Sequence, residues 1–192
     1  MPTYPQETDR YSLQPKKFIV WLFMISSFIF FAGLTSGFIV YSGDNLAKQL
    51  SIKMPQAFIY STILVVASSI TLQWAYIQTK RLNFAKQRIG LWLTLILGIA
   101  FICSQIYGWI VLTNLGAFFT SSNASISFVY VFTFTHILHI VAGLIIMIGA
   151  ISSSYKAVPN VVNLFRMEIS IVFWHFVDIL WIYLYVFLLL NQ

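Results

Sequence analysis

Four side chains in this sequence could do chemistry: His136, His139, His175 and Asp178. His136 and His139 are three residues apart, and so are His175 and Asp178, so each pair would lie on one face of a helix. Imidazole and carboxylate groups can relay protons, bind a metal ion or haem iron, or hydrogen-bond to one another as a structural cluster. The residue types alone leave these three interpretations open.

These side chains lie in strongly apolar surroundings. The chain has 192 residues, of which 59% are hydrophobic and 8% are charged, and this composition is outside the range of soluble domains. Five apolar runs each reach the roughly 20 residues that a helix needs to cross a bilayer. The runs are residues 18–41, 57–78, 89–112, 126–151 and 169–190. Asp178 is the one Lys, Arg, Asp or Glu within them.

The sequence therefore predicts an all-α integral membrane protein, a bundle of five transmembrane helices in a single domain of residues 18–192. The polar segment 1–17 contains three of the five prolines and is predicted to be an irregular tail on the inner face. A carboxylate near the centre of a bilayer costs about 2.5–3.5 kcal/mol, so Asp178 needs a partner, water or a bound proton.

Basic residues are distributed unevenly between the two sides of such a bundle. Nine of the eleven Lys and Arg residues fall on the side of the N-terminus, and only Lys48 and Lys53 fall on the other. This bias predicts an N-terminus inside and a C-terminus outside. Topology and inner-leaflet lipids then explain the net charge of +6 without nucleic acid. Arg88 and Arg166, at inner helix ends, are candidates for contacts with lipid headgroups.

The fourth and fifth predicted helices are antiparallel neighbours, because the connection between them is short. Counting ~1.5 Å per residue from their inner ends places His139 and Asp178 at the same depth, about 18 Å up. We therefore expect His139 or His175 to hydrogen-bond Asp178, and His136, His139, His175 and Asp178 to form a polar cluster that locks these two helices together. A metal site is less favoured, because the single cysteine, Cys103, lies in another helix.

Several segments resemble one known family. Residues 173–184 (FWHFVDILWIYL), which include Trp174 and Trp181, resemble the last-helix signature of subunit III of the haem-copper oxidases, the cytochrome c oxidase family. Glu168 stands where that family has a carboxylate at the opening of this helix. Residues 134–143 (FTHILHIVAG) resemble its paired-histidine helix. Members have seven helices or five, and this chain is similar to the five-helix form.

The resemblance implies a function. Subunit III is a non-catalytic part of a respiratory terminal oxidase, a complex that reduces oxygen to water and pumps protons. It implies that this chain contacts mainly subunit I and also subunit II, supports proton uptake by subunit I, and binds phospholipid. It implies haem and copper in the partner subunits and no cofactor in this chain. It favours a bacterial plasma membrane over a mitochondrial inner membrane, and it is compatible with a larger respiratory supercomplex.

Two positions depart from the family pattern. The family typically has a carboxylate at the position of Ser27 and frequently a Glu at that of Gly108. These losses leave the histidines without one expected partner.

The alternative functions are an accessory protein of a nitric oxide reductase or a quinol oxidase and, in other classes, a membrane haem protein or a proton-coupled carrier. The choice between cytochrome c and quinol as electron donor is made in other subunits.

Overall fold

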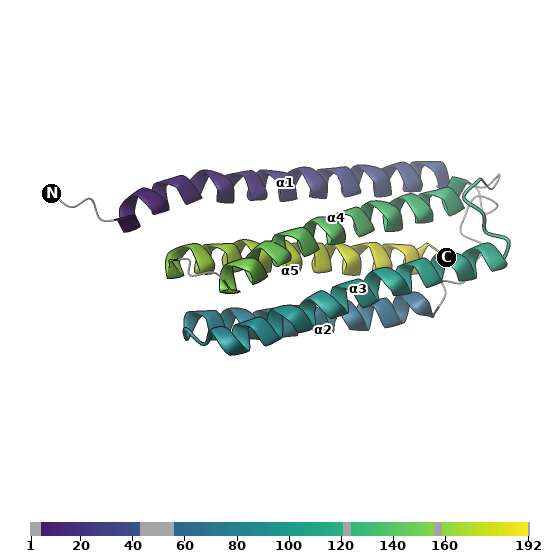
Figure 1. The fold of residues 1–192 in the computed structure, drawn as a ribbon. Helices are drawn as coiled ribbons and strands as arrows, with labels where there is room; N and C mark the ends of the chain where they lie inside the picture. Colours follow the sequence, from purple (N-terminus) through teal and green to yellow (C-terminus); the bar gives the residue numbers. More distant parts are fainter. Residues whose placement is uncertain (1–4, 43–55, 121–123, 156–158, 192) are drawn as a thin grey trace.

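The computed structural model describes residues 5–42, 56–120, 124–155 and 159–191. These residues form five long helices and no strand (Figure 1). The helices are α1 (Pro5–Ser42), α2 (Ala57–Lys80), α3 (Phe84–Asn114), α4 (Ala124–Tyr155) and α5 (Asn160–Leu190). All five are long and apolar enough to cross a membrane, which confirms the predicted all-α membrane bundle.

The helices extend beyond the apolar runs that predicted them. The prediction of an irregular tail over residues 1–17 is wrong from Pro5 onward, because α1 begins there, whereas residues 1–4 lie outside the described part. Pro5 stands in the first turn of α1, where its missing N–H would have no partner, whereas Pro15 lies inside the helix. Glu168 lies in the third turn of α5 and does not open it. Hydropathy marks the hydrocarbon-facing part of a helix, not where its backbone hydrogen bonds end.

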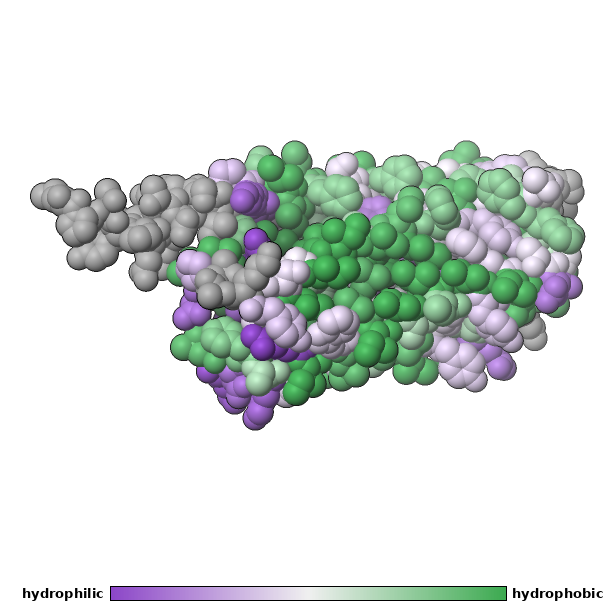
Figure 2. Space-filling view, viewed as in Figure 1, coloured by the Kyte–Doolittle hydropathy of each residue, from purple (hydrophilic) through white to green (hydrophobic). Residues whose placement is uncertain are grey.

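The fifth helix is the one around which the others are arranged. It packs against α1, α2 and α4, while α3 bridges α2 and α4. In Figure 1, α4 and α3 lie in front of α5 and α2, and α1 runs along the upper edge. Half of the residues in an 18-residue apolar stretch of α5 are buried. This share is larger than that of the corresponding stretch in any other helix described. The apolar band in Figure 2 covers the middle of the visible face, with polar residues toward both ends.

The indole of Trp174 fills a slot in the centre of the bundle. A Cβ atom at Gly98 of α3 would lie 2.8 Å from the ring of Trp174 and 2.9 Å from Leu144. A Cβ atom at Gly143 of α4 would lie 3.0 Å from the same ring. Small residues let helices approach closely in a membrane, and here the two glycines make room for one of the two tryptophans of α5. Gly33 of α1, in contrast, has nothing within 4 Å of its Cβ position.

This difference between the glycines gives a first prediction. We expect Gly98→Ala to lower the free energy of unfolding by about 1–3 kcal/mol, because the added methyl group must displace Trp174 or Leu144. The matched control Gly33→Ala should be neutral or slightly stabilising, because alanine is the better helix former and the site is open. Thermal unfolding of the detergent-solubilised subunit measures both. Equal effects at the two glycines would contradict the close packing of Trp174.

Candidate functional site

Asp178 is buried on α5, with 4% of its surface exposed, and its partner is a serine of α2. The hydroxyl oxygen of Ser69 lies 2.6 Å from Asp178 Oδ2 and also 2.6 Å from His175 Nδ1. His175 Nε2 lies 3.4 Å from the carboxamide oxygen of Gln73, one turn along α2 from Ser69. Asp178, Ser69, His175 and Gln73 thus form one chain of hydrogen bonds, which we name the α2–α5 chain.

Two proton arrangements satisfy the α2–α5 chain. In the first, His175 Nδ1–H donates to Ser69, and Ser69 donates to an ionised Asp178. In the second, a protonated Asp178 donates to Ser69, and Ser69 donates to a neutral His175. In both, His175 Nε2–H donates to Gln73, because the carboxamide oxygen can only accept. The neutral arrangement avoids two charges in a medium that solvates them poorly, so it suits a site within hydrocarbon.

Neither His139 nor His175 hydrogen-bonds Asp178 directly, since His175 reaches it through Ser69, so the prediction of a direct bond is wrong. His139 Nδ1–H donates to the carbonyl oxygen of Thr135 at 2.8 Å, and its Nε2 lies 3.0 Å from the hydroxyl oxygen of Ser27, which also lies 2.8 Å from the carbonyl oxygen of Phe23. The bond between His139 and Ser27 joins α4 to α1. The residue that replaces the family carboxylate, Ser27, therefore takes up the partnership whose loss was expected.

His136 also lies apart from the α2–α5 chain. Its side chain is fully buried between the rings of Phe101 and Trp181, whose centroids are 5.6 and 5.1 Å from its own. Among the described residues, neither ring nitrogen has a hydrogen-bond partner. The four predicted residues consequently form no single cluster between α4 and α5. Equal depth did not determine their contacts, because α5 directs Asp178 to Ser69 of α2, whereas His136 of α4 meets the ring of Trp181.

Two hydroxyl groups of α2 also accept hydrogen bonds from the two tryptophans of α5. Trp174 Nε1–H donates to Ser68 at 2.9 Å, and Trp181 Nε1–H donates to Thr62 at 3.0 Å. The reasoning from sequence did not single out Thr62, Ser68 or Ser69. A usable signal was present, because Ser61 and Thr62 precede Ser68 and Ser69 by seven residues, which places the four hydroxyls along one side of α2.

Both arginines proposed to contact lipid instead bind the C-terminal end of α4. Arg88 donates to the carbonyl and hydroxyl oxygens of Ser154 and stacks over the ring of Tyr155, 4.3 Å from its centroid. Arg166 Nη1 donates to the Ser153 hydroxyl at 2.6 Å and to the Gly149 carbonyl at 3.2 Å. A cation is favourable beside Ser154, because the last four carbonyl groups of a helix have no intrahelical partners, whereas Gly149 lies further inside α4. Contact with lipid stays a prediction for both residues.

Comparison with known proteins agrees with this architecture. The family model described as cytochrome c oxidase subunit III matches residues 10–191. The chain belongs to the cytochrome c oxidase subunit III family. The subunit III of Bacillus subtilis cytochrome c oxidase is 26% identical over 187 residues, which cover 95% of this chain and 90% of the relative. The subunit III of a cytochrome bo(3) ubiquinol oxidase from Buchnera aphidicola (subsp. Baizongia pistaciae) is 32% identical over 175 residues. These residues cover 88% of this chain and 88% of the relative.

Membership of the subunit III family confirms the resemblance carried by residues 173–184, and it fits a non-catalytic terminal oxidase subunit. The five membrane-crossing helices and the bacterial relatives place the chain as an integral protein of the bacterial plasma membrane. Four residues of the run 173–184, Trp174, His175, Asp178 and Trp181, form hydrogen bonds with hydroxyl groups of α2.

The contrast between the two histidines of α4 gives a second prediction. His136→Phe should leave the free energy of unfolding unchanged or raise it, because phenylalanine keeps the ring contacts and removes two buried nitrogens without partners. His139→Phe should lower it by about 0.6–1.7 kcal/mol, because the hydrogen bond to Ser27 is lost. Chemical unfolding of the purified subunit in micelles measures both. A larger loss for His136→Phe would mean that its imidazole has a partner, such as a buried water.

Proposed function

We propose that this chain packs laterally on subunit I of a bacterial terminal oxidase, contacts subunit II, and stabilises subunit I near the entry of its proton pathway. The observation that carries the proposal is the family match over nearly the whole bundle. The structure supports it, because the groups that could do chemistry are engaged in contacts between helices. The named relatives belong to a cytochrome c oxidase and a ubiquinol oxidase, and the proposal covers either kind of complex.

Haem and copper, on this proposal, are held by the partner subunits. Within the described residues, no three His, Cys, Asp or Glu side chains lie together in a way that could hold a metal ion. The histidines are directed to different neighbours: His139 to Ser27, and His175 to Ser69 and Gln73. Such divergent imidazoles suit a structural role better than ligation, which needs converging nitrogens.

The proposed orientation has the N-terminus inside. The N-terminal end of α1, the α2–α3 turn, the C-terminal end of α4 and the N-terminal end of α5 all lie at one end of the bundle (Figure 1). Basic residues gather at this end in the described segments, among them Lys16, Lys80, Arg88 and Arg166. The positive-inside rule assigns this end to the cytoplasm, which is the side from which an oxidase takes its protons.

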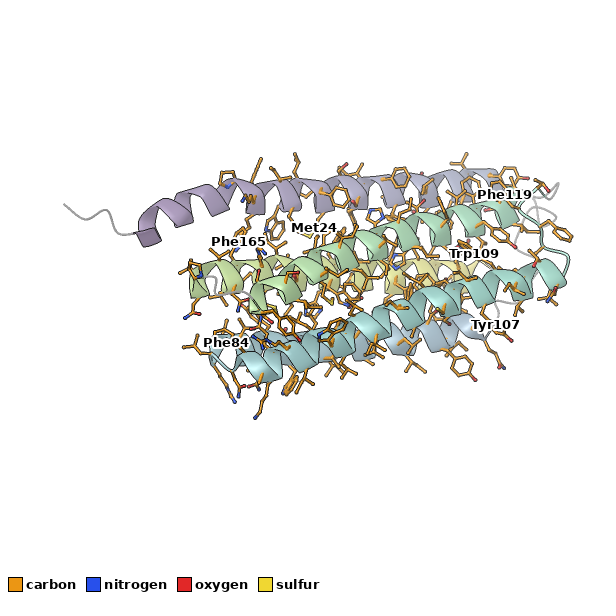
Figure 3. The ribbon with its side chains drawn as sticks, viewed as in Figure 1. Met24, Phe84, Tyr107, Trp109, Phe119 and Phe165 are labelled. Atoms are coloured by element: carbon orange, nitrogen blue, oxygen red, sulfur yellow. The ribbon has the colours of Figure 1, made fainter. Side chains whose placement is uncertain are left out.

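Phospholipid is proposed to bind at the same end. A cavity of about 260 Å³ lies where α1, α4 and α5 meet, and Lys16 and Arg166 border it together with the apolar Ile146 and Phe165. Figure 3 labels Phe165 near the end of the bundle where α5 begins. Two cations beside an apolar wall fit a lipid phosphate and the start of its acyl chain. Arg88 can join this headgroup region through the guanidinium N–H groups that Ser154 does not use.

Deletion of the chain tests the proposed function. We expect an oxidase assembled without it to begin turnover at close to the normal rate and to lose activity after fewer turnovers, because subunit I lacks lateral support near its proton entry. Oxygen consumption and proton pumping of the purified enzyme, followed until activity ceases, measure this. Restoring the chain from a plasmid should restore the working lifetime. If rate, pumping and lifetime all stay unchanged, the supporting role is wrong.

A further inference from the structure

The outer side of α5 is only partly covered, and it forms the floor of a trough. Helices α1 and α2 each pack along α5, and they are not among the helix pairs that form an interface with each other. Between α1 and α5 lies a groove of about 570 Å³, lined by Trp21, Met24, Phe28, His175, Phe176 and Ile179, among others. Figure 3 labels Met24 on the α1 side of this groove. Ile179 is 65% exposed on the floor.

Helix α2 borders the trough on the side opposite α1. The exposed end of the α2–α5 chain of hydrogen bonds lies there. Gln73 is exposed, and His175 is half-buried beside it. By helical rise, Gln73 lies about 10 Å from Lys80, and His175 lies about 13 Å from Arg166, so both are well inside the hydrocarbon layer. The other amide side chains within the five apolar runs, Gln78 and Gln105, are buried.

The NH₂ group of the exposed Gln73 side chain has no hydrogen-bond partner among the described residues. The carboxamide oxygen, in contrast, accepts from His175. Lipid acyl chains offer no acceptor, and a polar group without a partner in hydrocarbon costs several kcal/mol. A protein side chain with an acceptor oxygen would satisfy this amide, since polar side chains commonly join helices within membranes.

We propose that one transmembrane helix of a partner oxidase subunit lies in the trough between α1 and α2, places apolar side chains in the groove over α5, and presents an acceptor oxygen to Gln73. The inference rests on the proposed function, because it names the face through which the chain joins the complex. The groove extends along α5 from Val172 to Ile179 and along α1 from Trp21 to Phe28, about two turns of each helix. This length accommodates two successive side chains on one face of a docked helix.

Photocrosslinking in the intact oxidase tests the docked helix. A benzophenone amino acid in place of Ile179 should give an adduct with another subunit of the complex. The matched control is the same replacement at Ile96, which is 58% exposed on α3 and should give lipid adducts only. Lipid adducts alone at position 179, in a complex that retains the chain, would overturn the docked helix and leave the proposed function intact. Equal crosslinking to protein at both positions would also overturn it.

Loss of the amide provides a second measurement. Gln73→Leu should weaken retention of the chain in the detergent-solubilised oxidase by about 3- to 10-fold, while the isolated subunit unfolds as before. Tyr107→Leu, at a residue 61% exposed on α3, should not change retention. Unchanged retention of Gln73→Leu would contradict the proposed acceptor. If the unaltered chain does not co-purify with an oxidase at all, the proposed function itself fails.

Discussion

The structure depends on one physical constraint: apolar helices gain little by contacting each other when lipid is equally apolar. Their pairing must come from close packing and from polar groups that need partners. In this bundle the strongest such need is that of Asp178, a carboxyl group buried in a helix that is otherwise almost wholly apolar. Ser69 bonds one oxygen of this carboxyl group, Oδ2, and His175 at the same time, whereas Oδ1 has no partner among the described residues. These two bonds, together with those from Trp174 to Ser68 and from Trp181 to Thr62, hold α5 against α2.

The same rule recurs at the other helix pairs. The Thr35 and Tyr183 hydroxyls join α1 to α5 at 2.8 Å, and Trp109 donates to Thr133 at 2.8 Å between α3 and α4. Gln87 and Asn163 exchange two hydrogen bonds between α3 and α5, where both are buried. These contacts leave few buried polar atoms without a partner among the described residues. The exposed Gln73 stands out against this pattern, and for that reason it indicates a missing neighbour.

The sequence was sufficient for the number of helices, their approximate positions and the family, because length in hydrocarbon and the FWHFVDILWIYL signature are local properties. It was not sufficient for the contacts of the polar residues. The depth of Asp178 could be counted along the chain, but the direction in which α5 presents it depends on packing against three helices at once. Trp174, seated between Gly98 and Gly143, helps to set that direction. The hydroxyl groups of α2 were overlooked because each is unremarkable alone.

A double-mutant cycle between Ser69→Ala and Asp178→Leu tests most directly whether Asp178 holds α5 against α2. The free energies of unfolding of the two single variants and the double variant would be measured in one detergent. We expect a coupling energy of about 0.6–1.7 kcal/mol for this pair, as measured for interhelical hydrogen bonds elsewhere. The pair His139→Phe and Asp178→Leu should show a coupling energy near zero. Coupling of Asp178 to His139 and not to Ser69 would contradict the arrangement described for α5.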